Sequence, residues 1–109
     1  RQATAQSIAN IAWSFAAVRM VDMLLLAAIA DAAITCVAKC QPQDLANIAW
    51  AFSAQMVRHD PLMSAISPAS IAMIGNFTAQ GLSNMAWSLA TLPILDEPLL
   101  DAIAARASR

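Results

Sequence analysis

The chain contains the segment Gln43-Asp44-Leu45-Ala46-Asn47-Ile48-Ala49-Trp50, and related segments lie 37 residues before and after it. The earlier segment runs from Gln6 to Trp13 and the later one from Gln80 to Trp87, so all three tryptophans share one phase. A second block, Leu-Leu-Ala-Ala-Ile at residues 25–29, has related copies at 62–66 and 99–103. A period of this length is typical of stacked arrays in which one unit cannot bury its apolar face alone.

The apolar pattern predicts two helices in each copy. The first helices are expected over residues 6–18, 43–56 and 80–92. Because successive residues of a helix advance by about 100°, Ile8 and Phe15 fall on one side of the first helix. Gln6, Asn10 and Trp13 fall on the opposite side. We expect the apolar side to close each helix pair and the Gln/Asn/Trp side to contact a neighbouring copy or a ligand.

Acidic residues and prolines mark the expected starts of the second helices. Asp60-Pro61 places a capping carboxylate before a proline at the first helical position, and Asp22 is its counterpart in the first copy. Asp96-Glu97-Pro98 puts two carboxylates at the positive end of the last helix. Pro68 is expected to kink or break the second helix of the middle copy, and Gly75-Asn76 to end that unit.

These elements predict an all-α fold, in which six helices form three antiparallel hairpins of a right-handed α-α superhelix, or solenoid. Residues 1–109 form a single array, with copies at about 6–42, 43–79 and 80–109. Neither end has the polar cap that keeps a solenoid soluble. We therefore expect the isoleucine and tryptophan faces of the first copy, and the helix of Leu99 and Ile103 in the last copy, to expose apolar surface unless something covers them. The chain is then expected to continue, or to dock in a larger assembly.

The composition argues against several classes of protein. The six basic and seven acidic residues nearly balance, so there is no long-range attraction to phosphate or anionic membranes. The most apolar stretch, residues 23–38, is short for a membrane span and contains Asp31, so no transmembrane segment is expected. Cys36 and Cys40 are four residues apart in a helical stretch. They are expected to be small buried thiols rather than a disulfide or a zinc site.

No motif for catalysis is present in the sequence. His59 is next to Asp60, but adjacent residues rarely converge on one reacting atom, and no nucleophile is tied to the pair. The carboxylates mark helix starts, and there is no glycine-rich phosphate loop. We expect a protein that is not an enzyme and that has no cofactor, metal or small-molecule substrate.

The Gln/Asn/Trp side of the first helices has two interpretations. Its residues are Gln6, Asn10, Trp13, Gln43, Asn47, Trp50, Gln80, Asn84 and Trp87. Amides suit the base edges of single-stranded RNA, and tryptophan offers a stacking surface. Alternatively, each amide bonds an adjacent helix or turn, and each tryptophan is a wedge in the core. Because these residues are the same in all copies, we favour the structural interpretation.

Contacts to RNA or to a protein partner are then expected at positions that differ between copies, and at basic residues. The variable candidates are Ser7, Asp44, Ser14, Ser83 and Ser88, and the basic candidates are Arg19, Arg58 and Lys39. Basic side chains supply most of the affinity for phosphates, but here acids offset them. All these positions are equally consistent with ordinary solvent-facing residues. The alanines at 12, 49 and 86 are expected at close helix contacts.

The pattern Gln-x-Leu-Ala-Asn-x-Ala-Trp-Ala-Phe of residues 43–52, with Asp-x-Pro-Leu-Leu-x-Ala-Ile-Ala of residues 96–104, resembles the octotricopeptide-type repeats of algal and protist organellar proteins. The resemblance covers nearly the whole chain. It implies paired-helix repeats in a superhelix, a plastid or mitochondrial location, and sequence-selective binding of single-stranded RNA in RNA processing or translation. Weak charge, high apolarity and uncapped ends instead favour a protein-binding scaffold, such as an accessory subunit of a ribosome or photosystem.

Overall fold

The computed structural model describes residues 4–17 and 23–108. Within these residues the chain forms six α-helices, two short 3₁₀ turns and no β-strand, which confirms the predicted all-α class. The helices are α1 (Ala5–Ala17), α2 (Met23–Cys36), α3 (Pro42–Ala54), α4 (Asp60–Ala72), α5 (Ala79–Thr91) and α6 (Glu97–Ala107). None of these described helices has both the length and the apolar character needed to cross a membrane.

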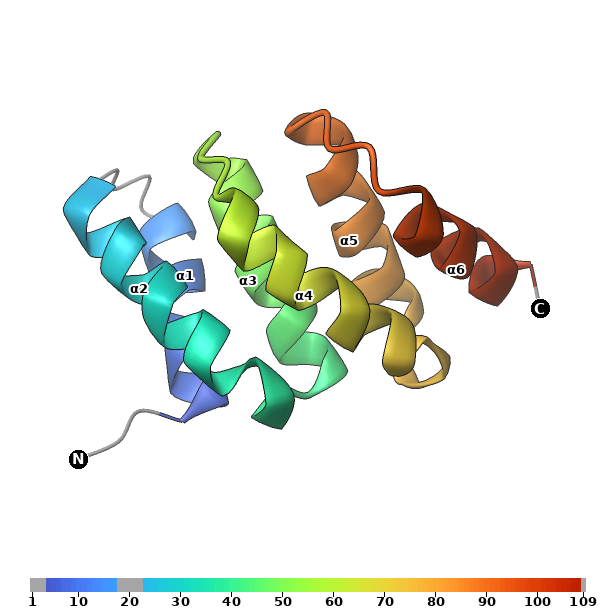
Figure 1. The fold of residues 1–109 in the computed structure, drawn as a ribbon, viewed down its shortest axis with the longest axis horizontal. Coiled ribbons are helices and arrows are strands. Elements are labelled where there is room, and N and C mark those ends of the chain that lie inside the picture. Colours follow the sequence, from blue (N-terminus) through green and yellow to red (C-terminus); the bar gives the residue numbers. More distant parts are fainter. Residues whose placement is uncertain (1–3, 18–22, 109) are drawn as a thin grey trace.

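The helices form two layers (Figure 1). In one layer α1, α3 and α5 lie side by side, with α3 packed between the other two. In the other layer α2, α4 and α6 each pack on the first helix of their own copy and on the neighbouring second helix. The chain therefore advances in helix pairs, from α1 and α2 at one end of the row to α5 and α6 at the other.

The same backbone turn recurs between successive helix pairs. A 3₁₀ turn follows α2 over Val37–Lys39 and follows α4 over Ile74–Asn76. The next residue is extended in both places, with φ and ψ of −71° and 140° at Cys40 and −72° and 141° at Phe77. Both side chains are buried and anchor the turn. The end of the middle copy, predicted at Gly75-Asn76, thus lies in the second of these two 3₁₀ turns. The backbone φ of Gly75 is not positive there.

Side-chain caps set the first residues of α4 and α6. Asp96 caps α6, because its Oδ1 accepts a hydrogen bond from the backbone N–H of Leu99 at 3.1 Å. At α4 the prediction of Asp60 as the cap is wrong by one residue. His59 caps this helix instead, with its Nδ1 accepting from the N–H three residues later at 3.1 Å. The predicted cap Asp22 lies outside the described residues.

The apolar side of the first helices is buried, and α3 in the middle of the row is enclosed most completely. Leu45, Ile48 and Phe52 are almost inaccessible to solvent. At the first end Ile11 and Trp13 are exposed, as predicted. At the other end α6 exposes apolar surface at Ala104 and Ala107, while its inward side packs on α4 and α5 and buries Leu99 and Ile103.

Pro68 does not break α4, so the break, one of the two predicted outcomes, is wrong. The helix continues to Ala72, four residues beyond the proline. Pro68 and Ser64, whose carbonyl loses its helical partner, are both exposed. Because this carbonyl can be hydrated and the proline ring takes no space in the core, the helix tolerates the missing hydrogen bond.

Replacing Pro68 with alanine should stabilise the protein by about 2 kcal/mol, because the new N–H can donate to the Ser64 carbonyl. Equilibrium urea denaturation measures this change. Pro61→Ala is the matched control, since Pro61 lies in the first turn of the same helix, where no N–H partner is needed. Its replacement should change stability by less than about 1 kcal/mol. A Pro68→Ala variant no more stable than the parent would contradict this account.

Candidate functional site

The three tryptophans form a stack across α1, α3 and α5. The ring centroids of Trp13 and Trp50 are 6.4 Å apart with 27° between their planes, and those of Trp50 and Trp87 are 6.4 Å apart with 32°. The outer two rings are 49% and 46% exposed, and the middle one is half-buried. The prediction of a tryptophan wedge in the core is therefore wrong for Trp13 and Trp87, whereas Trp50 packs partly against the core. The rings join neighbouring helix pairs at the surface, each contact contributing about 0.5–1.5 kcal/mol.

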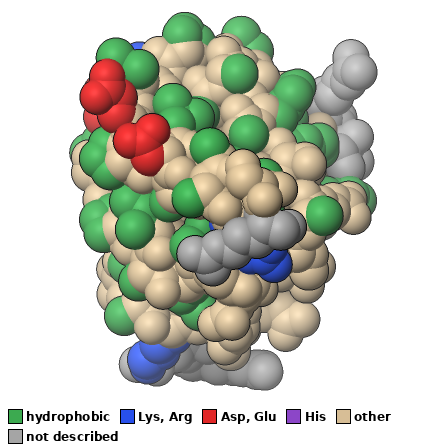
Figure 2. Space-filling model, turned by 90° about the vertical axis from the view of Figure 1, so that its right-hand side faces the viewer, with side chains coloured by type: hydrophobic (Ala, Val, Ile, Leu, Met, Phe, Trp, Pro, Cys, Tyr) green, Lys and Arg blue, Asp and Glu red, His purple; other side chains and the backbone are tan. Residues whose placement is uncertain are grey.

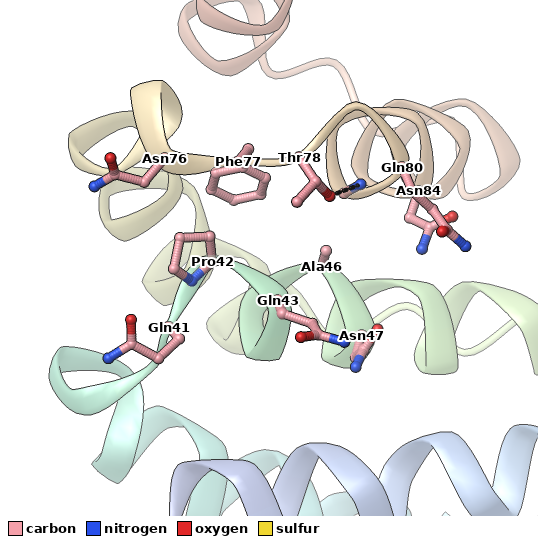
Figure 3. A pocket seen from close by; sticks show the side chains of 11 residues that line it. Gln41, Pro42, Gln43, Ala46, Asn47, Asn76, Phe77, Thr78, Gln80 and Asn84 are labelled. Carbon is pink, nitrogen blue, oxygen red and sulfur yellow. Dashed lines mark hydrogen bonds between the residues drawn. The ribbon is translucent and has the colours of Figure 1, made fainter.

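The amide residues precede the tryptophans on the same side of the first helices. We call this surface the amide–tryptophan face, formed by Gln6, Asn10, Trp13, Gln43, Asn47, Trp50, Gln80, Asn84 and Trp87. In Figure 3 the side chains of Gln43 and Asn47 lie together on α3, and the corresponding pair lies together on α5. Within the described part of the chain, none of the six amide side chains has a hydrogen-bonding partner. Their donors and acceptors are available to a ligand.

Two hollows adjoin this face. One, of about 530 Å³, lies between the first turns of α3 and α5, and both amide pairs line it with Thr78 (Figure 3). The other, of about 750 Å³, lies between the start of α1, the end of α2 and the start of α3. Gln6 and Lys39 are among its lining residues. The hollows follow the N-terminal ends of successive first helices.

The amide–tryptophan face carries almost no charge. The described residues of α1, α3 and α5 include no lysine or arginine, and their one acidic residue is Asp44. This carboxylate is buried and caps α3, with its Oδ2 accepting from the N–H of Gln41 at 3.0 Å. Lys39 is exposed beside the second hollow. Arg58 lies beyond the C-terminal end of α3 and pairs with Asp60 at 2.7 Å.

The other predicted contact residues lie on the flanks of the first helices, which face neighbouring helix pairs. Ser88 is fully buried, and its carbonyl accepts a hydrogen bond from α3. Ser7 is in the first turn of α1, where its Oγ donates to the carbonyl three residues earlier at 2.9 Å. Ser14 of α1 and Ser83 of α5 are exposed at opposite ends of the row. Arg19 lies outside the described residues. The structure therefore does not gather these residues into one site.

The histidine and the cysteines have structural surroundings. His59 caps α4, and its ring meets Phe52 edge-on with centroids 6.4 Å apart. Cys40 is a buried free thiol, as predicted, and Cys36 is half-buried. Burial, with smaller effects from Asp44 and Cys36, raises the pKa of Cys40 from 9.0 to about 11. No three potential metal ligands come together within the described residues.

Cys40 should therefore react slowly with iodoacetamide in the folded protein. The raised pKa lowers its thiolate fraction at neutral pH by about 100-fold, and burial adds to the effect. Timed alkylation followed by peptide mass spectrometry, in native buffer and in urea, measures the ratio of the Cys40 alkylation rates in the folded and unfolded protein. Because folding favours the neutral thiol, the associated stability is complete below pH 9 and is lost as the pH rises to about 11. Equal rates in both buffers would refute this prediction.

The sequence matches no protein-family model and no curated protein. The candidate site is therefore defined by the geometry of the amide–tryptophan face.

Proposed function

We propose that the protein is a non-enzymatic segment of an α-α superhelix, made of three helix hairpins, that binds single-stranded RNA on its amide–tryptophan face. One observation supports this most strongly: six amides without partners in the described chain stand in a row beside three stacked tryptophans. Amides can both donate to and accept from base edges. One set of contacts for each helix pair suits a mode in which each repeat holds one base. The octotricopeptide-type resemblance supports the same function, in organellar RNA processing or translation.

Base contacts rather than phosphate contacts would dominate this binding. The described residues of the three first helices have no cationic side chain, and Lys39 lies at one edge of the face. Gln43 and Gln80, which line the hollow, are in the first turns of their helices, where the helix dipole supplies partial positive charge. We therefore expect modest affinity and a shallow salt dependence, with a log–log slope near one, far below that of proteins with 6–10 phosphate contacts.

Fluorescence anisotropy with single-stranded RNA oligonucleotides, between about 50 and 200 mM salt, tests this function. Combining Gln43→Ala with Asn47→Ala should weaken binding about tenfold, because two hydrogen-bonding amides are lost. Ser64→Ala is the control, since Ser64 is exposed on α4 in the opposite layer, and it should leave affinity unchanged. Circular dichroism checks that all variants fold. If the parent protein shows no binding at the lowest salt, the RNA proposal is overturned.

A protein partner is the second candidate, and the near-absence of charge on the face favours it. The same amides can bond the N–H and C=O groups of a polypeptide, and the exposed tryptophan edges can pack on its side chains. This scaffold function predicts stable co-migration with a large organellar complex in the presence of ribonuclease. The Gln43→Ala and Asn47→Ala double variant should lose that co-migration. Co-migration that ribonuclease abolishes would favour RNA instead.

A further inference from the structure

The two ends of the row of helix pairs have complementary surfaces, and we propose that the protein binds a second copy of itself head to tail. In this contact α1 and α2 of one molecule pack on α5 and α6 of the next. It repeats the interface that already joins neighbouring helix pairs within the chain. The proposal is independent of what the amide–tryptophan face binds.

The interface within the chain has a defined register. Ser53 Oγ of α3 donates to the carbonyl oxygen of Ser88 in α5 at 3.3 Å, across 35 residues. In the first turn of α5 the two helices also approach closely, since a Cβ placed on Gly81 would lie 3.9 Å from the Cβ of Ala46 in α3. In both contacts the side of α3 that faces the next copy meets the side of α5 that faces the previous copy.

The same register can be applied between two molecules through the 37-residue period. It brings Ser83 of α5 against Ser7 of the second copy, and Ala90 against Ser14 of the second copy. All four are small residues, like their counterparts at the internal contact, so the helices can approach closely. Ile11 of the second copy is then buried against the preceding helix pair, as Ile48 and Met85 are within the chain.

The α1–α2 end exposes large apolar residues that are buried in the other copies. Ile11 is 45% exposed and Leu25 is 37% exposed. Their counterparts one and two periods later are at most 1% exposed: Ile48 and Met85 for the first, Leu62 and Leu99 for the second. These counterparts are buried because, in the second and third copies, the preceding helix pair packs on them. A helix pair with the surface of α5 and α6 would cover this end in the same way.

The α5–α6 end exposes small residues at positions that are buried in the earlier copies. Ser83, Ala104 and Ala107 are exposed. Their counterparts are all buried: Ala9, Ala46, Ala30, Ser67, Ala33 and Ser70. Figure 2 views this end and shows hydrophobic side chains across much of it, with acidic side chains gathered at one edge. Large residues at one end therefore face small ones at the other, as at the internal contacts.

The tryptophan stack gives the contact a spectroscopic signature. Trp13 and Trp87 each have one stacking partner and are nearly half exposed, whereas Trp50 has two. Head-to-tail binding places Trp87 of one molecule beside Trp13 of the next and continues the stack. A heterologous contact of this kind does not end at a dimer unless a ring closes.

Sedimentation velocity over a concentration series tests the proposal. The mass of the parent protein should rise with concentration beyond that of a dimer, and its near-ultraviolet circular dichroism should grow. Ile11→Arg blocks one end and Ala104→Arg the other, and both residues are exposed in the single chain, so folding should persist. Each variant alone should remain a monomer, while an equimolar mixture should form a species of twice the 11.5 kDa chain mass and no larger. A parent protein that stays monomeric, or a single variant that dimerises, would overturn the proposal.

Discussion

Replacing Ile48 with alanine should lower the free energy of unfolding by about 2–5 kcal/mol. Ile48 is 1% exposed in α3, at the middle of the row, so removal of its side-chain carbons leaves a cavity that neighbouring helices cannot easily fill. Small domains have only about 5–15 kcal/mol of stability in total. This one substitution should therefore remove a large part of the stability of the whole chain.

Ile11→Ala provides the matched control for Ile48→Ala. Ile11 has the same place in the first copy but is 45% exposed, so we expect a loss of less than about 1 kcal/mol. Urea denaturation should be carried out at low protein concentration, so that any association between molecules does not add to the measured stability. If the two variants lose equal stability, Ile48 is not enclosed between helix pairs in the way described here.

The burial of Ile48 was predictable from the sequence, because the 37-residue period and the helical phase both place it on the apolar side. The position of the tryptophans was not, although their phase opposite Ile8 pointed away from the core. The identity of these residues in all three copies favoured a wedge in the core and outweighed that signal. Trp13, Trp50 and Trp87 instead cover one another, which requires knowing that successive first helices lie side by side.

The error in the cap of α4 and the burial on the last helix have local causes. His59 occupies the position that Asp96 occupies one period later, so alignment of the copies could have identified it as the cap of α4. At the last helix the prediction did not separate the inward side of the helix from its outward side. A terminal helix still has an inward side, however, and Leu99 and Ile103 lie on it. The exposed apolar residues of α6 are Pro98, Ala104, Ala105 and Ala107.

The amide–tryptophan face was less accessible from the sequence than the fold. Variation between copies was taken as a sign of ligand contact, but two causes within the fold produce it. Asp44 and Ser7 occupy the same first-turn position and make different hydrogen bonds there. Ser83 lies exposed at the α5–α6 end of the described residues, whereas its counterpart Ala46 is buried against α5. The amides that lack partners are the invariant ones, and this became visible only in the structure.

Replacing Ala49 with leucine should destabilise the protein by about 3 kcal/mol, at the upper end of what overpacking usually costs. Ala49 is completely buried, as is its counterpart Ala12, in agreement with the prediction of close helix contacts at these positions. Nearby, α3 and α5 are so close that a Cβ on Gly81 would touch the Cβ of Ala46 at 3.9 Å. Three added carbon atoms cannot fit without moving the helices apart.

The displacement caused by Ala49→Leu should reach the amide–tryptophan face. The Ser53–Ser88 hydrogen bond and the contact between Trp50 and Trp87 both depend on the spacing of α3 and α5. Near-ultraviolet circular dichroism should therefore weaken together with stability.

Ala86→Leu is the control for Ala49→Leu, because Ala86 has the same position but is only partly buried, with no helix pair after it in this chain. We expect a cost of less than about 1 kcal/mol and an unchanged tryptophan signal at low protein concentration. If Ala49→Leu left both stability and the tryptophan signal unchanged, α3 and α5 would have room to adapt. The alanines would then not set the spacing that aligns the amides and the tryptophans.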